Sequence, residues 1–173
     1  MKKLNKKGFT LIELMIVLAI IAILAVVLIP KAGLLKDNAK GSGVAANVNS
    51  VRALLETKSA DSGYFAASGA GALKTIAALT SAFTGANAIE NPWLKAATTV
   101  ADTATPDTTS VVVTDQTGTA ANDTTAEAID VVKAVTTADT TDKGITYVWV
   151  CKDGFVVYGL DGEGLPTGLQ AIN

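Results

Sequence analysis

The stretch FTLIELMIVLAIIAILAVVLI, residues 9–29, decides how this chain is organised. Only Thr10 and Glu13 interrupt its apolar character. As a helix it is roughly 31 Å long at about 1.5 Å per residue, which matches the hydrocarbon core of a bilayer. Residues 1–8 precede it and contain four lysines, so this segment is expected to stay in the cytoplasm and the rest of the chain to lie outside.

Three kinds of N-terminal segment share this pattern. One is a single-pass anchor, the second is a secretory signal peptide cut near Ala32, and the third is a short leader removed ahead of the helix. Glu13 separates them, because a carboxylate inside an apolar segment costs free energy and marks a functional site. Neither an anchor nor a signal peptide needs that cost, so Glu13 favours the leader.

A cut after Gly8 would give Glu13 a partner. It would create a new amino group on Phe9, four residues before Glu13. Two opposite charges that are already removed from water attract each other strongly. We therefore expect Glu13 to meet the Phe9 amine, in its own helix or in a neighbouring subunit, and to fix the register in which subunits add.

The segment KKGFTLIE, residues 6–13, resembles the type III signal sequence of bacterial type IV pilins and of the pseudopilins of type II secretion. The resemblance implies that a dedicated membrane peptidase cuts between Gly8 and Phe9 and N-methylates Phe9. It also implies that Glu13 acts in assembly, and many type IV pilins have a proline where this chain has Pro30. The resemblance is close over residues 1 to about 30 and much looser beyond them.

Pro30 predicts a kink in a long helix, because proline removes one backbone hydrogen bond and its ring clashes with the preceding turn. The alternative is that Pro30 ends the membrane helix. Residues 31–40 remain compatible with a helix, which favours the kink. Beyond them an apolar stripe at helical spacing predicts that the helix packs on a sheet before ending at Asp61-Ser62-Gly63; its members are Val44, Val48, Val51 and Leu55.

The chain therefore divides into four predicted segments. Residues 1–8 form a leader peptide, 9–30 a transmembrane and filament-core helix, 31–60 an amphipathic continuation of that helix, and 61–173 a globular head. Inside the head, residues 72–84 predict a short helix whose inward face is formed by Leu73, Ile76, Leu79 or Thr80, and Phe83. Asn91-Pro92-Trp93 predicts a cap or turn.

The C-terminal half predicts strands and one more helix. Residues 110–114 form a β-rich run, and Thr124 and Glu127 have the spacing of a capping box at the start of a helix. Residues 145–152 and 155–160 predict a hairpin with a type I′ turn at Asp153-Gly154. The first of these strands alternates between two faces, and the sequence does not settle which face packs on the long helix.

The composition argues against an enzyme and against a nucleic-acid binding protein. The chain has no histidine, the commonest acid–base catalyst, and shows no phosphate-binding loop or paired-cysteine metal motif. Its net charge is −2, and without the four lysines of residues 1–8 it would be −6, which disfavours phosphate contacts. We predict no catalytic residues, no cofactor and no strong nucleic-acid binding.

Two features remain open to a second interpretation. Asp161 and Glu163 lie in a glycine-rich stretch and are weak candidates for a calcium site, but calcium needs six to eight oxygen ligands, so a solvated turn is favoured. Cys151 is the only cysteine, so it forms no intramolecular disulfide. A lone cysteine is usually a buried small apolar residue, and intermolecular pairing is the minority alternative.

The sequence as a whole predicts an α+β fold, with a long N-terminal helix against a C-terminal antiparallel sheet. The predicted function is a structural subunit of a type IV pilus, held in the inner membrane as a precursor and then built into an extracellular helical filament. Its expected partners are identical subunits, the prepilin peptidase and the pilus assembly machinery. The alternatives are a pseudopilin or minor pilin of a secretion or DNA-uptake system, and a membrane-anchored or secreted binding domain.

Overall fold

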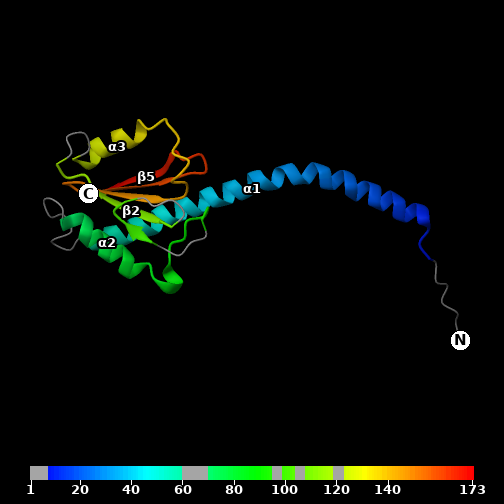
Figure 1. Ribbon diagram of the computed structural model, residues 1–173, viewed down its shortest axis with the longest axis horizontal. Helices are drawn as coiled ribbons and strands as arrows, with labels where there is room; N and C mark the ends of the chain where they lie inside the picture. The colour runs from blue at the N-terminus through cyan, green and yellow to red at the C-terminus, as the bar shows by residue number, and fades with distance from the viewer. Residues whose placement is uncertain (1–7, 60–69, 95–98, 104–107, 119–122) are drawn as a thin grey trace. The chain divides into compact units, whose positions relative to one another are not determined.

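A computed structural model of the chain describes residues 8–59, 70–94, 99–103, 108–118 and 123–173 (Figure 1). It divides into two compact units, Met1–Asn38 and Ala39–Asn173. One helix, α1, covers Leu11–Ser59 and so contributes to both. The predicted helix end at 61–63 lies outside the described residues.

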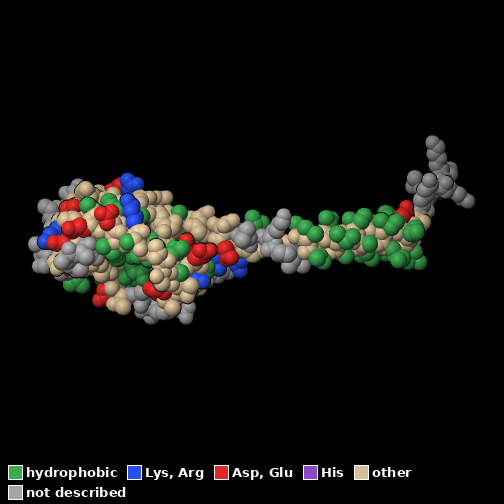
Figure 2. Space-filling view, turned by 90° about the horizontal axis from the view of Figure 1, so that it is seen from above, with side chains coloured by type: hydrophobic (Ala, Val, Ile, Leu, Met, Phe, Trp, Pro, Cys, Tyr) green, Lys and Arg blue, Asp and Glu red, His purple; other side chains and the backbone are tan. Residues whose placement is uncertain are grey.

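The first unit consists of the N-terminal part of α1. This part includes a segment, Leu11–Leu28, that is long and apolar enough to cross a membrane, with a mean hydropathy of 3.2. The large hydrophobic side chains of Leu11–Leu28 are all at least half exposed. Figure 2 shows hydrophobic side chains on the surface along this segment. The backbone stays helical through Pro30, so the alternative that Pro30 ends the helix is wrong. The kink at Pro30 stays a prediction.

The second unit has an α+β fold, which confirms the predicted class. After the C-terminal part of α1 come α2 (Ala70–Ala82), the short 3-10 helix η1 (Gly85–Asn87), β1 (Val100–Ala101) and β2 (Val111–Asp115). They are followed by α3 (Thr125–Lys133), β3 (Thr146–Val150), β4 (Phe155–Leu160) and β5 (Pro166–Ile172). The run at 110–114 is thus a strand, as predicted.

The five strands form one sheet in the order β1-β2-β3-β4-β5. Strands β3, β4 and β5 form its antiparallel part, while β1 and β2 join it in parallel. A parallel neighbour needs a long crossover, and the connection from β2 to β3 supplies one that contains α3. Helix α3 lies on one side of the sheet and α2 on the other (Figure 1).

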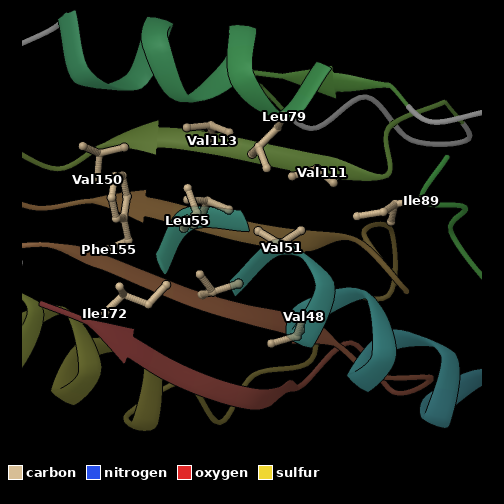
Figure 3. Close-up of a cluster of buried hydrophobic side chains, with 12 residues drawn as sticks. Val48, Val51, Leu55, Leu79, Ile89, Val111, Val113, Val150, Phe155 and Ile172 are labelled. Atoms are coloured by element: carbon tan, nitrogen blue, oxygen red, sulfur yellow. The ribbon is translucent and has the colours of Figure 1, made fainter. Parts of the chain in front are cut away.

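The main core lies between the sheet and helices α1 and α2 (Figure 3). Val44, Val48, Val51 and Leu55 have no exposed surface, so the predicted stripe on α1 is confirmed as core. Val148 and Val150 of β3 pack into this core, which settles the question of which face of that strand meets α1. Burying one such side chain stabilises the fold by about 1.5–3 kcal/mol.

A second core covers the opposite face of the sheet. Ala128 and Val132 of α3 pack there against Cys151, Val156 and Tyr158. Thr124 caps α3 in the predicted capping box, since its hydroxyl accepts from the backbone N–H of Glu127 while the Glu127 carboxylate accepts from the Thr124 N–H. Both faces of the central strands are therefore covered by helices.

The predicted helix at 72–84 is present as α2, but one of its inward positions is wrong. Leu79 is fully buried, and Ile76 and Phe83 are partly buried against the core. Leu73 instead leaves 68% of its surface exposed, while Thr75 is buried. An apolar side chain at helical spacing is thus left facing solvent at the first turn of α2.

The turn of the β3–β4 hairpin lies one residue earlier than predicted. Val150 pairs with Phe155, and the Cys151 N–H donates to the Gly154 carbonyl, so Lys152 and Asp153 occupy the turn. Gly154 does not have the positive φ that a type I′ turn requires. Glycine is needed here because a Cβ would collide with the carbonyl oxygen of Ile172 in β5.

The turn residues are held by contacts to the start of α3. The Asp153 carboxylate accepts from the Thr125 N–H at 2.7 Å and from the Thr125 hydroxyl at 3.0 Å. Lys152 forms an ion pair with Asp123 and donates its N–H to the Asp123 carbonyl at 2.9 Å. These contacts favour a turn at Lys152 and Asp153, whereas the sequence pattern alone favoured a turn at Asp153 and Gly154.

Gly159 is required by the close packing of α1 on β4, because a Cβ there would collide with the Val44 side chain. We expect Gly159→Ala to lower the free energy of unfolding by about 1–3 kcal/mol, as overpacking of a core does. Gly41→Ala is the matched control. Gly41 is a helical glycine with nothing within 4 Å of an added Cβ, so its replacement should stabilise the helix by up to about 1 kcal/mol.

Thermal unfolding of the detergent-solubilised full chain, followed by tryptophan fluorescence, measures both effects. The midpoint should fall for Gly159→Ala and should rise or stay unchanged for Gly41→Ala. Equal midpoints for the two variants would contradict the packing of Val44 on Gly159.

Candidate processing and assembly site

Gly8 and Phe9 lie in a non-helical segment immediately before α1 begins at Leu11. The Phe9 side chain is 87% exposed. An added Cβ on Gly8 would have nothing within 4 Å. The peptide bond between the two residues is therefore accessible to a peptidase without any unfolding of the helix.

Glu13 is bound to Thr10 across the first turn of α1. Its Oε2 atom accepts from the Thr10 N–H at 2.8 Å and from the Thr10 hydroxyl at 2.8 Å. The Glu13 N–H in turn donates to the Thr10 hydroxyl oxygen at 3.3 Å. This reciprocal pattern is a capping box, which satisfies backbone donors that have no partner within the helix.

The capping role of Thr10 was not predicted from the sequence. The signal was present, because Thr10 and Glu13 have the same Thr-x-x-Glu spacing as Thr124 and Glu127. A carboxylate at this position is also favoured by the positive end of the helix dipole. Glu13 therefore has a structural function in the uncut chain, in addition to the one expected from the pairing with a Phe9 amine.

Gly8 and Phe9 lie just before the first turn of α1, which contains Glu13. In the uncut chain the Phe9 nitrogen is part of a peptide bond and carries no charge. A cut after Gly8 would place an ammonium group one residue before Thr10, which binds the exposed Glu13 carboxylate. Both capping bonds use Oε2, and Oε1 takes part in neither. The carboxylate can thus cap its helix through one oxygen and offer the other to a cation.

The helix that follows this site has no polar face. From Leu11 to Leu28, every leucine, isoleucine, valine and methionine is between 50% and 81% exposed. A helix that is apolar on all sides must be surrounded by lipid or by other apolar helices. This surface can therefore serve both as a membrane span and as a contact for several neighbouring helices.

Asp161 and Glu163 belong to the second unit, in the turn between β4 and β5. The Oδ1 atom of Asp161 accepts from the backbone N–H groups of Glu163 and Leu165, each at 2.9 Å. Gly164 completes this turn with a φ of 80°. Among the described residues, no three acidic, cysteine or histidine side chains lie together as a metal site would require. The Asp161 carboxylate organises the turn.

Cys151 is 1% exposed and lies in the core beneath α3. Burial, together with the nearby Asp153 carboxylate, raises the pKa of its thiol to about 12. We expect the folded protein to resist Ellman's reagent at pH 8, because only about one thiol in ten thousand would be ionised. Reaction should become rapid in denaturant, and fast labelling of the folded protein would contradict the buried position.

The same pKa predicts a pH dependence of stability. The ordinary pKa of a cysteine thiol is 9.0, so the unfolded chain loses this proton first as the pH rises. The stabilising contribution is therefore complete below pH 9 and is lost between pH 9 and about pH 12.

Comparison with known protein families identifies a motif in the N-terminal segment. Residues 3–29 match the family model of the prokaryotic N-terminal methylation motif. The type IV wide pilus major component PilA4 of Thermus thermophilus is 58% identical over 45 residues, which are 26% of this chain and 34% of that protein. The match thus spans about a third of the relative's length. No solved structure matches the chain.

The motif covers the accessible Gly8–Phe9 bond, the Thr10–Glu13 cap and the apolar helix, which are the features that the geometry singles out. The description of the family model names N-terminal methylation. The chain thus carries the prokaryotic N-terminal methylation motif and is similar over part of its length to a type IV pilus component.

Proposed function

We propose that the chain is a structural subunit of a type IV pilus, assembled into a helical extracellular filament after its leader is removed. The observation that carries the proposal is the arrangement at the start of α1. An accessible Gly8–Phe9 bond, a capped Glu13 and a wholly exposed apolar helix follow one another within residues 8–28. The chain is the substrate of the processing enzyme and has no catalytic role of its own.

Processing would convert one end of the helix into a paired site. The prepilin peptidase would cut between Gly8 and Phe9 in the inner membrane and methylate the new amino group. The resulting ammonium would pair with Glu13, in the same helix or in a neighbour. An unpaired charge in an apolar filament core is costly, so subunits would add only in the register that pairs both groups.

Assembly would then remove the apolar helix from lipid. Because the helix has no polar face, its neighbours in the filament must cover it on all sides. Equivalent helices that meet head to tail form a contact that does not close, and such a contact generates a filament. The assembly machinery would extract each subunit from the inner membrane, and the finished pilus would lie outside the cell.

A major pilus subunit is favoured over a pseudopilin or a minor pilin. PilA4, which is similar to this chain over 45 residues, is named as the major component of a wide pilus. A pseudopilin would share the cut and the methylation, so these steps alone do not separate the two. The location of the mature chain does.

Mass spectrometry of the N-terminal peptide tests the proposal, on filaments sheared from the native cells. A chain that starts at methylated Phe9 in the sheared fraction is the expected result. A processed chain found only in the membrane would favour a pseudopilin. A chain that starts at Met1, or a soluble chain that starts after Ala32, would overturn the pilus assignment.

A further inference from the structure

The second unit exposes very little large apolar surface. Among its described residues from Ala39 onward, only two large hydrophobic residues are exposed to solvent. Leu73 leaves 68% of its surface exposed, and Val135 leaves 42%. Leu73 stands on the first turn of α2, while Leu79 of the same helix is fully buried. A leucine that the helical pattern directs inward but that faces solvent is a candidate for contact with another molecule.

Val135 lines a groove between the end of α3 and the edge strand β5. The apolar lining consists of Val132, Val135, Pro166 and Leu169, and Lys133 lies at the same groove. Its volume is about 320 Å³. This is at the lower end of the range of small-molecule sites, which is roughly 300–1,000 Å³. A groove of this size and lining suits one or two inserted apolar side chains.

Leu73 and the groove lie on opposite faces of the sheet. Phe155 and Val157 of β4 pack in the core with α2, and the alternate residues Val156 and Tyr158 pack in the core with α3. The two cannot meet within one subunit. A two-fold dimer uses one surface patch on both partners, and no single patch contains both Leu73 and the groove. A contact between Leu73 of one subunit and the groove of another is therefore head to tail.

The two parts of the chain that contain these features differ in net charge, although Lys133 at the groove is itself basic. Residues 39–94, which include α2, contain four basic and three acidic residues, a net +1. Residues 111–173, which include α3 and β5, contain three basic and nine acidic residues, a net −6. Lys74 is next to Leu73, and Asp130 is exposed on α3 close to Val132. Attraction between Lys74 of one subunit and Asp130 of the next would favour this approach.

We infer that Leu73 of one subunit inserts into the α3–β5 groove of the next subunit, so that the globular units as well as the apolar helices are joined head to tail. This contact rests on the proposed filament function. It identifies a second copy of this chain as the occupant of the groove. It also accounts for an exposed leucine and an exposed valine that the fold of a single subunit leaves unused.

Cysteine cross-linking in intact filaments tests the contact. The full chain is produced with Leu73→Cys combined with Val135→Cys, or with Leu73→Cys combined with Leu169→Cys, and sheared filaments are mildly oxidised. Two cysteines per chain in a head-to-tail contact give a ladder of disulfide-linked multimers. The three single variants and the unaltered chain should give no ladder, since Cys151 is buried. Dimers alone, or filaments in which neither pair forms a ladder, would overturn the contact.

A charge placed at position 73 provides the second readout. Because Leu73 is exposed, Leu73→Asp should fold normally, yet it should reduce the yield of sheared filament at least about tenfold. Ser81→Asp is the matched control, an exposed position two turns further along the same helix, and should leave the yield unchanged. Equal yields from the two variants would overturn the contact.

The two proposals fail in different ways. Filaments of chains that start at methylated Phe9, but without ladders, refute only the contact between globular units. An unaltered chain that keeps its Met1 start and forms no filament refutes the pilus function, and the contact with it.

Discussion

The Gly8→Val variant is expected to remain uncut, with its original Met1 start, and to stay in the membrane. Gly8 is exposed, and an added Cβ would meet nothing within 4 Å, so the substitution does not disturb the fold. A branched side chain next to the scissile bond would instead obstruct the peptidase. Mass spectrometry of the membrane fraction should find the full leader on nearly every chain, and no filament should be sheared from the cells.

Gly33→Ala is the matched control for this variant. Gly33 is also exposed, with nothing within 4 Å of an added Cβ, but it lies inside α1 and far along the chain from the cut. Its cut should be normal. Efficient release of chains that start at Phe9 from Gly8→Val would show that the cleavage does not depend on glycine, and would remove the basis for assigning Gly8 to the processing site.

The periodic parts of the fold could be predicted from the sequence. The stripe of Val44, Val48, Val51 and Leu55 is buried as a helical face should be, because packing and periodicity agree there. The capping box at Thr124 is present because it depends only on residues three positions apart. Local patterns predicted these features well, since the interactions that form them are also local.

Features that depend on distant contacts were not predictable in this way. Strand β5, with Pro166 and Gly168, lacks a strand pattern of its own and is ordered by pairing with β4. The hairpin turn is shifted because Gly154 must admit the carbonyl of Ile172 and because Asp153 binds Thr125. The parallel pairing of β2 with β3 follows from the crossover that contains α3, and no residue of either strand encodes it.

The candidate site also contains residues that could be predicted from the sequence and one, Thr10, that was not predicted. Gly8, Phe9 and Glu13 could be proposed from the sequence because they belong to a short motif of neighbouring residues. The capping role of Thr10 is carried by the Thr-x-x-Glu spacing, which the surrounding apolar run obscures. Glu13 therefore has two candidate functions, helix capping and pairing with the Phe9 ammonium. Variants that affect only one of them can separate the two.

The Glu13→Ala variant is expected to be cut and methylated but not assembled. The proposed cut lies in the Gly8–Phe9 segment outside the helix, whereas the proposed assembly would require a partner for the Phe9 ammonium. Loss of the carboxylate would leave that ammonium unpaired in an apolar filament core. The mature chain should accumulate in the membrane, and the yield of sheared filament should fall at least about a hundredfold.

Two further variants separate the charge of Glu13 from its capping bonds. Glu13→Gln keeps an oxygen that can accept from both Thr10 donors, as glutamine does in a capping box, but it carries no charge. Thr10→Val removes the hydroxyl from the cap and leaves the carboxylate in place. If the charge pair sets the register, Glu13→Gln should fail to assemble as Glu13→Ala does, while Thr10→Val should still form filaments. The reverse result, with filaments from Glu13→Gln and none from Thr10→Val, would assign Glu13 to helix capping and leave the register of the filament to the apolar helix and the globular units.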